Sequence, residues 1–187
     1  SVQEMPELTL GLLNSNSDGA DVLANLRKVL DSTQQNSATY NPSYAGLQQK
    51  TMEAAKHRGT TFWPWTFNNE NDFYKFYSWG IHGITTDYSK WASNFPVEIE
   101  AVSVPLSVVL NQPVSLGIKL TTQTKAVSTT AANELVVIGG TANAQVQADG
   151  RVTFTSAGTA VVMPGYRYQM GSSTYSYVLM AKPITLI

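Results

Sequence analysis

Side chains that could take part in chemistry stand at the ends of four apolar segments in the first half of the chain. The segments read LTLGLL, SATYNPS, TTFWPWTF and IHGITTDY, and the residues at their ends are Asn14, Tyr40, Asn41, Trp65, Asn68 and Asp87. A carboxylate can transfer protons or hold a cation, an amide can donate to an oxygen, and an indole can line an apolar pocket. Asp87 is the one acidic residue of this set, and it has no acidic partner close in sequence.

The segments between these runs are predicted to be helices, and this determines where the residues at the ends of the apolar runs lie. In NSNSDGADVLANLRKVLDS the apolar residues recur at helical spacing, at Val22, Leu23, Leu26, Val29 and Leu30. YAGLQQKTMEAAKHRG and NNENDFYKFYSWG are further predicted helices, each closed by glycine. Regular alternation of strand and helix predicts parallel strands, whose carboxyl ends carry the ligand sites.

The second half of the chain has a different composition. Beyond Pro96 it consists of short runs rich in Val, Thr, Ser and Ala, and QVQADGRVTF alternates about Asp149-Gly150, a strong hairpin signal. We predict an all-β domain of sandwich type over residues 96–187, after an α/β domain over residues 1–95. Four tyrosines near the end, Tyr166, Tyr168, Tyr175 and Tyr177, are expected to form cross-strand pairs, with sugar stacking as the alternative.

The overall composition narrows the function classes. Of the 187 residues 43% are hydrophobic and only 13% charged, and the formal net charge is −1. This gives no electrostatic reason to expect nucleic acid or an anionic membrane as partner. Without cysteine there is no thiolate nucleophile, and no apolar run is long enough for a transmembrane segment. The opening SVQEMPELTL has no signal-peptide pattern, so we expect a removed leader or a start within a longer protein.

One stretch of the first half resembles a known family. AAKHRGTTFWPWTFNNENDFYKFYSWGIHGITTDYS is similar to the end of the glycerophosphodiester phosphodiesterase family, with a W-T-x-N pattern at Trp65, Thr66 and Asn68. The further pattern G-x-x-G-I-x-T-D-Y is matched by Gly80, Gly83, Ile84, Thr86, Asp87 and Tyr88. Ser89 stands where the family usually has Pro. The resemblance covers about residues 8–95.

The resemblance implies the C-terminal half, about four β/α units, of a TIM-type (β/α)8 barrel. Family members are metal-dependent hydrolases that split a glycerophosphodiester into glycerol 3-phosphate and an alcohol, in lipid and glycerol metabolism. Their acid–base His pair and the carboxylates for a divalent cation (Ca or Mg) lie on the other barrel half. His57–Gly59 reads HRG but precedes a strand instead of following one, so we interpret it as a helix end. The chain alone is therefore expected to be inactive, with no catalytic residue and no metal ligand.

Site roles can be assigned on the same basis. Trp65, Asn68 and Tyr40 are the candidate substrate-binding residues, although Trp65 could instead pack in the barrel as Trp63 is expected to, and Asn68 could cap the next helix. Asp87 and Thr86 are expected to support the site by hydrogen bonds. His82, at the start of its segment, is expected to be structural.

The second half resembles bacterial immunoglobulin-like modules of group 2. QVQADGRVTFTSAGTAVV carries the pattern, with Gly150 and Gly158 in turns. Together the resemblances predict an extracellular or cell-surface bacterial protein. Its expected partners are a small glycerophosphodiester, the missing N-terminal barrel half or a second copy, and cell wall or glycan. The alternative is a non-catalytic surface scaffold or glycan-binding module with a relic half-barrel.

Overall fold

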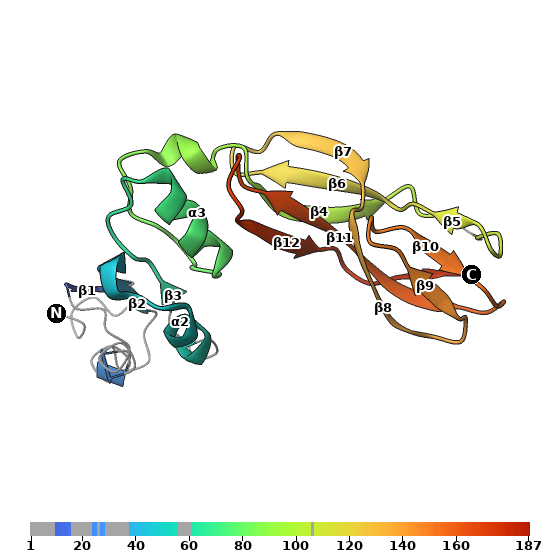
Figure 1. Ribbon diagram of the computed structural model, residues 1–187, viewed down its shortest axis with the longest axis horizontal. Coiled ribbons are helices and arrows are strands. Elements are labelled where there is room, and N and C mark those ends of the chain that lie inside the picture. Colours follow the sequence, from blue (N-terminus) through green and yellow to red (C-terminus); the bar gives the residue numbers. More distant parts are fainter. Residues whose placement is uncertain (1–9, 16–23, 26, 29–37, 56–60, 106) are drawn as a thin grey trace. The chain divides into compact units, whose positions relative to one another are not determined.

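The chain divides into an N-terminal unit, residues 1–89, and a C-terminal unit, residues 90–187 (Figure 1). The computed structural model describes residues 10–15, 24–25, 27–28, 38–55, 61–105 and 107–187. The apolar residues of the first predicted helix lie outside this set, as do His57 and Gly59. No helix within the described ranges is long and apolar enough to span a bilayer.

The N-terminal unit contains an open parallel sheet of three strands in the order β1-β2-β3. The strands are β1 (Leu10–Asn14), β2 (Ala38–Pro42) and β3 (Thr61–Phe62). Leu10 pairs with Ala38, and Thr39 pairs with Thr61, both in parallel register. The 3-10 helix η1 (Tyr44–Gly46) and the helix α2 (Gln49–Ala55) lie between β2 and β3 in the chain. The predicted parallel pairing is therefore confirmed for these strands.

The helix α3 (Glu70–Ser78) follows β3 and is closed at both ends by its own sequence. The Asn69 side chain accepts hydrogen bonds from the backbone N–H groups of Asn71 and Asp72, at 2.9 and 3.1 Å. Two of the unpaired donors of the first turn are satisfied in this way. At the other end Gly80 has a φ of +85°, a conformation in which a side chain is strained.

The segment at residues 81–88 is not a strand, although its apolar, β-branched sequence predicted one. It runs beside β3 and is held by separate hydrogen bonds: His82 N–H donates to the Phe62 carbonyl at 3.1 Å, and Thr85 N–H to the Pro64 carbonyl at 3.1 Å. Pro64 has no N–H to return, so a continuous ladder cannot form at this point. The four-stranded half-barrel expected from the sequence is thus a three-stranded sheet with one extended neighbour in the described part.

Aromatic packing forms the core of the N-terminal unit. Tyr40 meets Phe62 edge to face, with ring centroids 5.5 Å apart. Tyr44, directly after β2, stacks on Phe67 at 4.4 Å, and both rings contact Phe76 of α3. These contacts fix the loop after β2 against α3, so the carboxyl ends of β2 and β3 have one defined arrangement.

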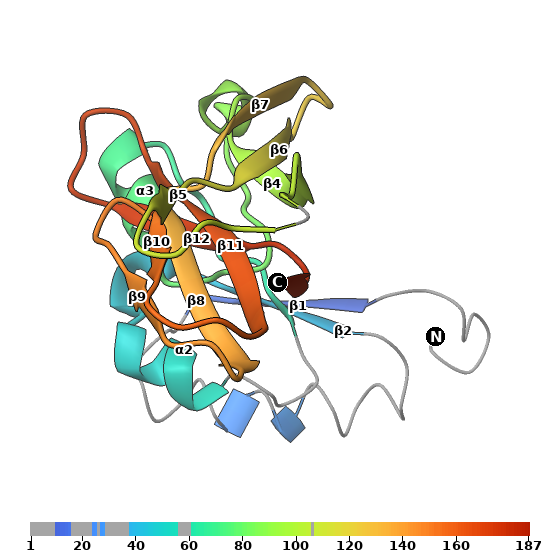
Figure 2. The same cartoon turned by 90° about the vertical axis from the view of Figure 1, so that its right-hand side faces the viewer.

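In the described residues of the C-terminal unit, ten strands form three antiparallel sheets. The strands are β4 (Pro96–Val102), β5 (Pro113–Val114), β6 (Gly117–Thr122), β7 (Val127–Ala131), β8 (Glu134–Gly140), β9 (Ala144–Val146), β10 (Val152–Phe154), β11 (Ala160–Gln169), β12 (Ser176–Met180) and β13 (Ile184–Leu186). Figure 2 shows this unit from the side of β5, β9 and β10. The 3-10 helix η2 (Ser89–Ala92) precedes β4. The sheets are β4-β6-β7, β5-β10-β9, and β11 with β8, β12 and β13, and none of them closes on itself.

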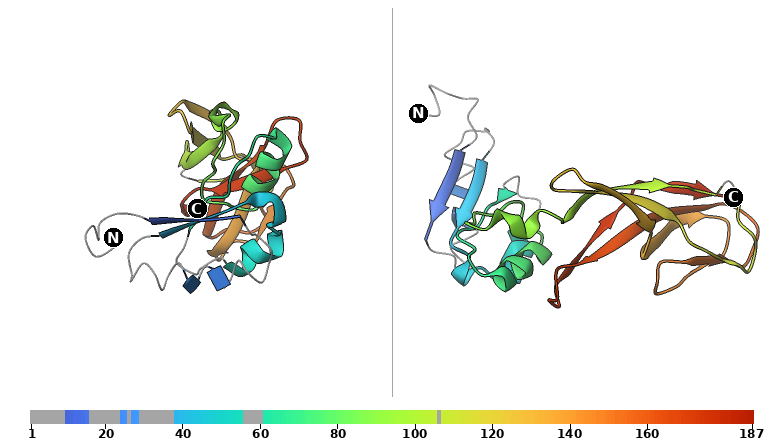
Figure 3. Two further views of the ribbon diagram at one scale, coloured as in Figure 1. Left: turned by 90° about the vertical axis from the view of Figure 1, so that its left-hand side faces the viewer. Right: turned by 90° about the horizontal axis from the view of Figure 1, so that it is seen from above.

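Side chains from several of these strands meet in one core. Figure 3 shows the strands of this unit from two further directions. Leu116, Ile118, Val152, Phe154 and Val162 are each at most 2% exposed. The predicted hairpin is confirmed, because β9 and β10 pair antiparallel on either side of a turn in which Gly150 has a φ of +81°.

The strand β7 was not expected from the sequence. It pairs with β6 alone, and all five of its residues are exposed. In the register of this pair Ser128 stands opposite Leu120 and Thr130 opposite Ile118, so hydroxyl side chains occupy positions next to core residues.

Candidate functional site

Strands β2 and β3 of the parallel sheet have one buried and one open face, whereas β1 is exposed on both, since Leu12, opposite Tyr40, is 39% exposed. Tyr40, Phe62 and Pro64 are buried, whereas the residues that alternate with them along the strands are partly or largely exposed. On this open face Leu13 is 71% exposed and Trp63 is 40% exposed. Parallel sheets are normally covered on both faces, so the open face is the unusual surface of this unit.

Hydrogen bonds hold Asn41 and Trp65 in place at the carboxyl end of the open face. The Trp65 indole Nε1–H donates to the Asn41 carbonyl at 2.8 Å, so this ring, three residues after β3, reaches back to β2. The Thr39 hydroxyl donates to Asn41 Oδ1 at 2.8 Å, so the Asn41 amide oxygen is turned toward Thr39. Asn41 and Trp65 are both half-buried, which leaves part of each surface available to a ligand.

A second polar group joins the loop after β3 to the end of the segment at 81–88. Asn68 Nδ2 donates to Asp87 Oδ2 at 2.8 Å, and Asp87 N–H donates to Asn68 Oδ1 at 3.4 Å. Next to this pair the Thr86 hydroxyl donates to the Phe67 carbonyl at 2.6 Å, while Phe67 N–H donates to the Thr85 carbonyl at 2.9 Å. The structure thus brings Asn68, Thr86 and Asp87 together.

Two expectations for individual residues need correction. Asn68 does not cap α3: Asn69 does, because the amide of Asn68 is taken by Asp87. Tyr40 has no exposed surface, so the described fold does not offer it to a ligand. The neighbouring residue Asn41 lies on the open face, and strand alternation was the signal that could have identified it.

Trp63 was expected to pack in the barrel layers, and in the described part of the sheet it lies on the open face with 40% of its surface exposed. Its indole lies directly over Gly83, where an added Cβ would come within 2.3 Å of the ring. Its Nε1–H donates to the Thr61 hydroxyl at 3.0 Å. Trp63 therefore covers the extended segment at Gly83 and leaves its other side exposed.

His82 links the same segment to β3 and is well explained as structural. Its Nδ1 accepts the backbone N–H of Phe62 at 3.1 Å, which requires that nitrogen to carry no proton. Partial desolvation lowers the pKa of His82 below its ordinary value, and this favours the neutral ring that the hydrogen bond needs.

A divalent cation does not fit the described residues. No three His, Cys, Asp or Glu side chains gather in the described ranges, and the side-chain partner of Asp87 is a neutral amide. Hard cations take six or more oxygen ligands, usually with several carboxylates. Within the described ranges, the strand ends therefore form a candidate binding surface for a ligand, and no metal-ligand cluster is seen there.

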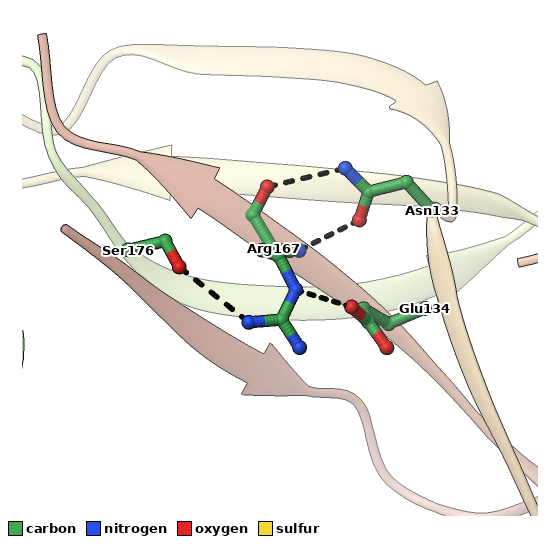
Figure 4. Close-up of polar contacts among 4 residues, drawn as sticks. All are labelled: Asn133, Glu134, Arg167 and Ser176. Atoms are coloured by element: carbon green, nitrogen blue, oxygen red, sulfur yellow. Dashed lines mark hydrogen bonds and ion pairs between the residues drawn. The ribbon is translucent and has the colours of Figure 1, made fainter. Parts of the chain in front are cut away.

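A polar cluster in the C-terminal unit lies on strands β8, β11 and β12 and in the residue before β8 (Figure 4). The Asn133 amide accepts the Arg167 backbone N–H at 2.6 Å and donates to the Arg167 carbonyl at 3.1 Å. The Arg167 guanidinium donates to Glu134 and reaches the Ser176 hydroxyl at 3.5 Å. The Asn133 side chain thus bonds both backbone groups of Arg167 beyond the last pair of β8 and β11, Glu134 with Gly165, which is a structural role.

The tyrosines of the C-terminal unit include the predicted cross-strand pair. Tyr168 stands opposite Tyr177 on β11 and β12, with ring centroids 5.5 Å apart. The Tyr177 hydroxyl donates to the Pro96 carbonyl at 2.6 Å, and Phe95 packs against both rings. Burial raises the pKa of Tyr168 above its ordinary value.

The N-terminal unit is therefore a parallel α/β segment with polar and aromatic residues at the carboxyl ends of its strands. Residues 5–90 match the glycerophosphoryl diester phosphodiesterase family. The match supports this family for the N-terminal part of the chain, and with it a TIM-barrel-type fold and a glycerophosphodiester phosphodiesterase-like function. Members of the family generally use divalent cations. Neither the curated proteins nor the solved structures gave a match to the chain.

Proposed function

We propose that this chain is the C-terminal part of a metal-dependent glycerophosphodiester phosphodiesterase. The N-terminal unit would supply half of the barrel, and the enzyme would split a glycerophosphodiester into glycerol 3-phosphate and an alcohol. The chain alone would not catalyse this reaction, because the acid–base residues and the ligands of the Ca or Mg ion would belong to the other half.

One observation carries the proposal: the open face of the parallel sheet. The family match supports a closed barrel, in which this face would point inward. The large exposed fractions of Leu13 and Trp63 are then explained, since both side chains would be buried once further strands cover them. A second barrel half, or alternatively a second copy of this chain, would provide that cover.

Within the complete enzyme this chain would bind and orient the substrate. Trp65 would present its indole to the glycerol part of the substrate. Asn68, held by Asp87 and Thr86, would stand at the rim of the site with an amide hydrogen that can donate to a phosphate oxygen. Asp87 and Thr86 would act through Asn68 and the neighbouring backbone, as positioning residues.

The C-terminal unit would be a separate immunoglobulin-like sandwich that attaches the enzyme outside the cell. Its antiparallel sheets and shared core support a sandwich, and the turns at Gly150 and Gly158, with φ values of +81° and +143°, fit the expected glycine positions. A bacterial, cell-surface location with cell wall or glycan as partner follows from this proposal.

A scaffold with a relic half-barrel is the second candidate, favoured by the missing acidic cluster in the described residues. Hydrolysis of glycerophosphocholine by the purified chain, with calcium or magnesium and with a chelator, is the first test. We expect no turnover in either condition, and chelator-sensitive turnover would refute the inactive-fragment proposal. The coding sequence before Ser1 separates the candidates, because strands with H-R-G and E-x-D there indicate an enzyme, and an unrelated domain indicates a scaffold.

The partner that covers the open face can be identified by light scattering after size exclusion. A half-barrel that lacks its partner should associate through Leu13 and Trp63. A clean and stable monomer of the purified chain would contradict the pairing of two copies.

A further inference from the structure

The carboxyl end of the open face contains a pre-oriented amide donor that the family resemblance does not assign. Asn41 follows the buried Tyr40 and lies on the open face next to Trp65. Its amide orientation is fixed from one side, because the Thr39 hydroxyl donates to Oδ1 at 2.8 Å. The Nδ2 group therefore points away from Thr39, and no acceptor for its hydrogens is seen in the described ranges of the chain.

Gly11 makes this arrangement possible. A Cβ atom at Gly11 would come within 3.0 Å of the Thr39 hydroxyl and 3.1 Å of Asn41 Oδ1. Such contacts are tighter than ordinary van der Waals distances, so a side chain here would push the Thr39–Asn41 pair aside. The neighbouring strand β1 thus leaves room for a polar pair on a face that otherwise carries Leu13 and Trp63.

The surroundings of Asn41 indicate what it binds. The described residues of this face are Gly11, Leu13, Thr39, Asn41, Thr61, Trp63 and Trp65, and none of them is charged. A phosphate bound among them would lack a counter-charge, whereas an uncharged hydroxyl compound needs only an amide and an apolar surface. The indole of Trp65, whose Nε1–H donates to the Asn41 backbone carbonyl at 2.8 Å, provides an apolar surface at the adjacent strand end.

We infer that Asn41 donates to a hydroxyl oxygen of an uncharged polyol group, which rests against the indole of Trp65. The inference deepens the proposed function and rests on it, since the glycerol part of a glycerophosphodiester is such a group. It makes Asn41, held by Thr39, a residue that selects the polyol part of the substrate, separate from the phosphate-binding role proposed for Asn68.

Nuclear magnetic resonance of the isotope-labelled full chain tests this inference with glycerol as probe. Titration to about 0.1 M half-fills a site with a dissociation constant of that size. We expect glycerol to shift the side-chain amide signals of Asn41 and the indole N–H signal of Trp65, and inorganic phosphate to leave both unchanged. No shift with glycerol, or an equal shift with phosphate, would overturn the inference.

Variants assign the effect to the amide. Asn41→Leu keeps the volume and removes the donor, so glycerol binding, followed at the Trp65 indole signal, should weaken about three- to tenfold, the loss of one neutral hydrogen bond. Thr39→Val leaves the amide in place but frees its orientation, and should weaken binding about two- to threefold. Asn71→Leu, an exposed asparagine on α3, is the matched control and should bind as the parent does. Unchanged binding in Asn41→Leu would refute the role of Asn41.

The two proposals fail in different ways. If the completed enzyme hydrolyses glycerophosphocholine while Asn41→Leu binds glycerol normally, only the polyol inference is wrong. If glycerol binds at Asn41 and Trp65 but no hydrolysis is found with any barrel partner, only the proposed enzymatic function is wrong.

Discussion

The hydrogen-bonded pair of Asn68 and Asp87 gives a quantitative prediction for the N-terminal unit. One hydrogen bond, at 2.8 Å, joins the two exposed side chains. The other, at 3.4 Å, runs from the Asp87 backbone N–H to the Asn68 side chain. A hydrogen bond to a charged group contributes about 1.5–3 kcal/mol, and exposed ionic contacts contribute about 0.2–1 kcal/mol. We therefore expect a coupling free energy of about 1 kcal/mol between the two residues.

A double-mutant cycle with Asn68→Ala, Asp87→Ala and the double variant measures this coupling. Urea unfolding followed by tryptophan fluorescence is a suitable assay, since three of the four tryptophans, at positions 63, 65 and 79, lie in the N-terminal unit. Each single variant should lower the free energy of unfolding, and the double variant should lower it by about 1 kcal/mol less than the sum of the two.

A control cycle pairs Asp87 with Asn71 in place of Asn68. Asn71 is an exposed asparagine on α3 whose side chain has no part in the hydrogen-bonded pair. Asn71→Ala and Asp87→Ala should act additively, within about 0.3–0.5 kcal/mol. If the cycle of Asn68 with Asp87 were additive within the same range, Asp87 would not hold this segment through Asn68. The positioning role given to it would then be refuted.

Three further variants test other parts of the structure. The His82 pKa is lowered on folding, so the unfolded chain binds the proton more tightly than the folded chain. The free energy of unfolding of the N-terminal unit should therefore fall as the pH drops below about 6.5. In urea titrations at several pH values, His82→Leu should lose this part of the pH dependence. Gly140→Ala should destabilise the C-terminal unit by about 2 kcal/mol or more in thermal unfolding, since φ is +119° and the new Cβ would lie 2.2 Å from the Thr159 carbonyl oxygen, whereas the control Gly139→Ala has open space. Asn69→Ala should cost about 1 kcal/mol and shorten α3 in circular dichroism, and equal stability would contradict its role as the cap.

The alternation of strands and helices could be predicted because it depends on local patterns. Apolar runs, glycine stops and the Asp149-Gly150 turn each act over a few residues, and the parallel sheet and the hairpin follow from them. The prediction of a strand at residues 81–88 was wrong because pairing there depends on Pro64, which has no N–H to donate and belongs to the neighbouring segment.

The details of the site were beyond local patterns. Strand alternation places Tyr40 and Asn41 on opposite faces, but the letters TYN do not say which of the two faces is covered by the rest of the unit. The two adjacent asparagines Asn68 and Asn69 are equally good caps by residue type. Their roles are decided by Asp87, which lies 19 residues further along the chain and takes the first of them.

The polar edge strand β7 has a consequence for how the protein behaves in concentrated solution. A free strand edge invites pairing with another molecule, and long flat apolar edges lead to aggregation. In β7 the positions next to the core residues Ile118 and Leu120 carry the hydroxyls of Thr130 and Ser128. A strand added to this edge would meet hydroxyl side chains at these two positions and gain little apolar burial from them, so this edge offers another molecule less than an apolar edge would.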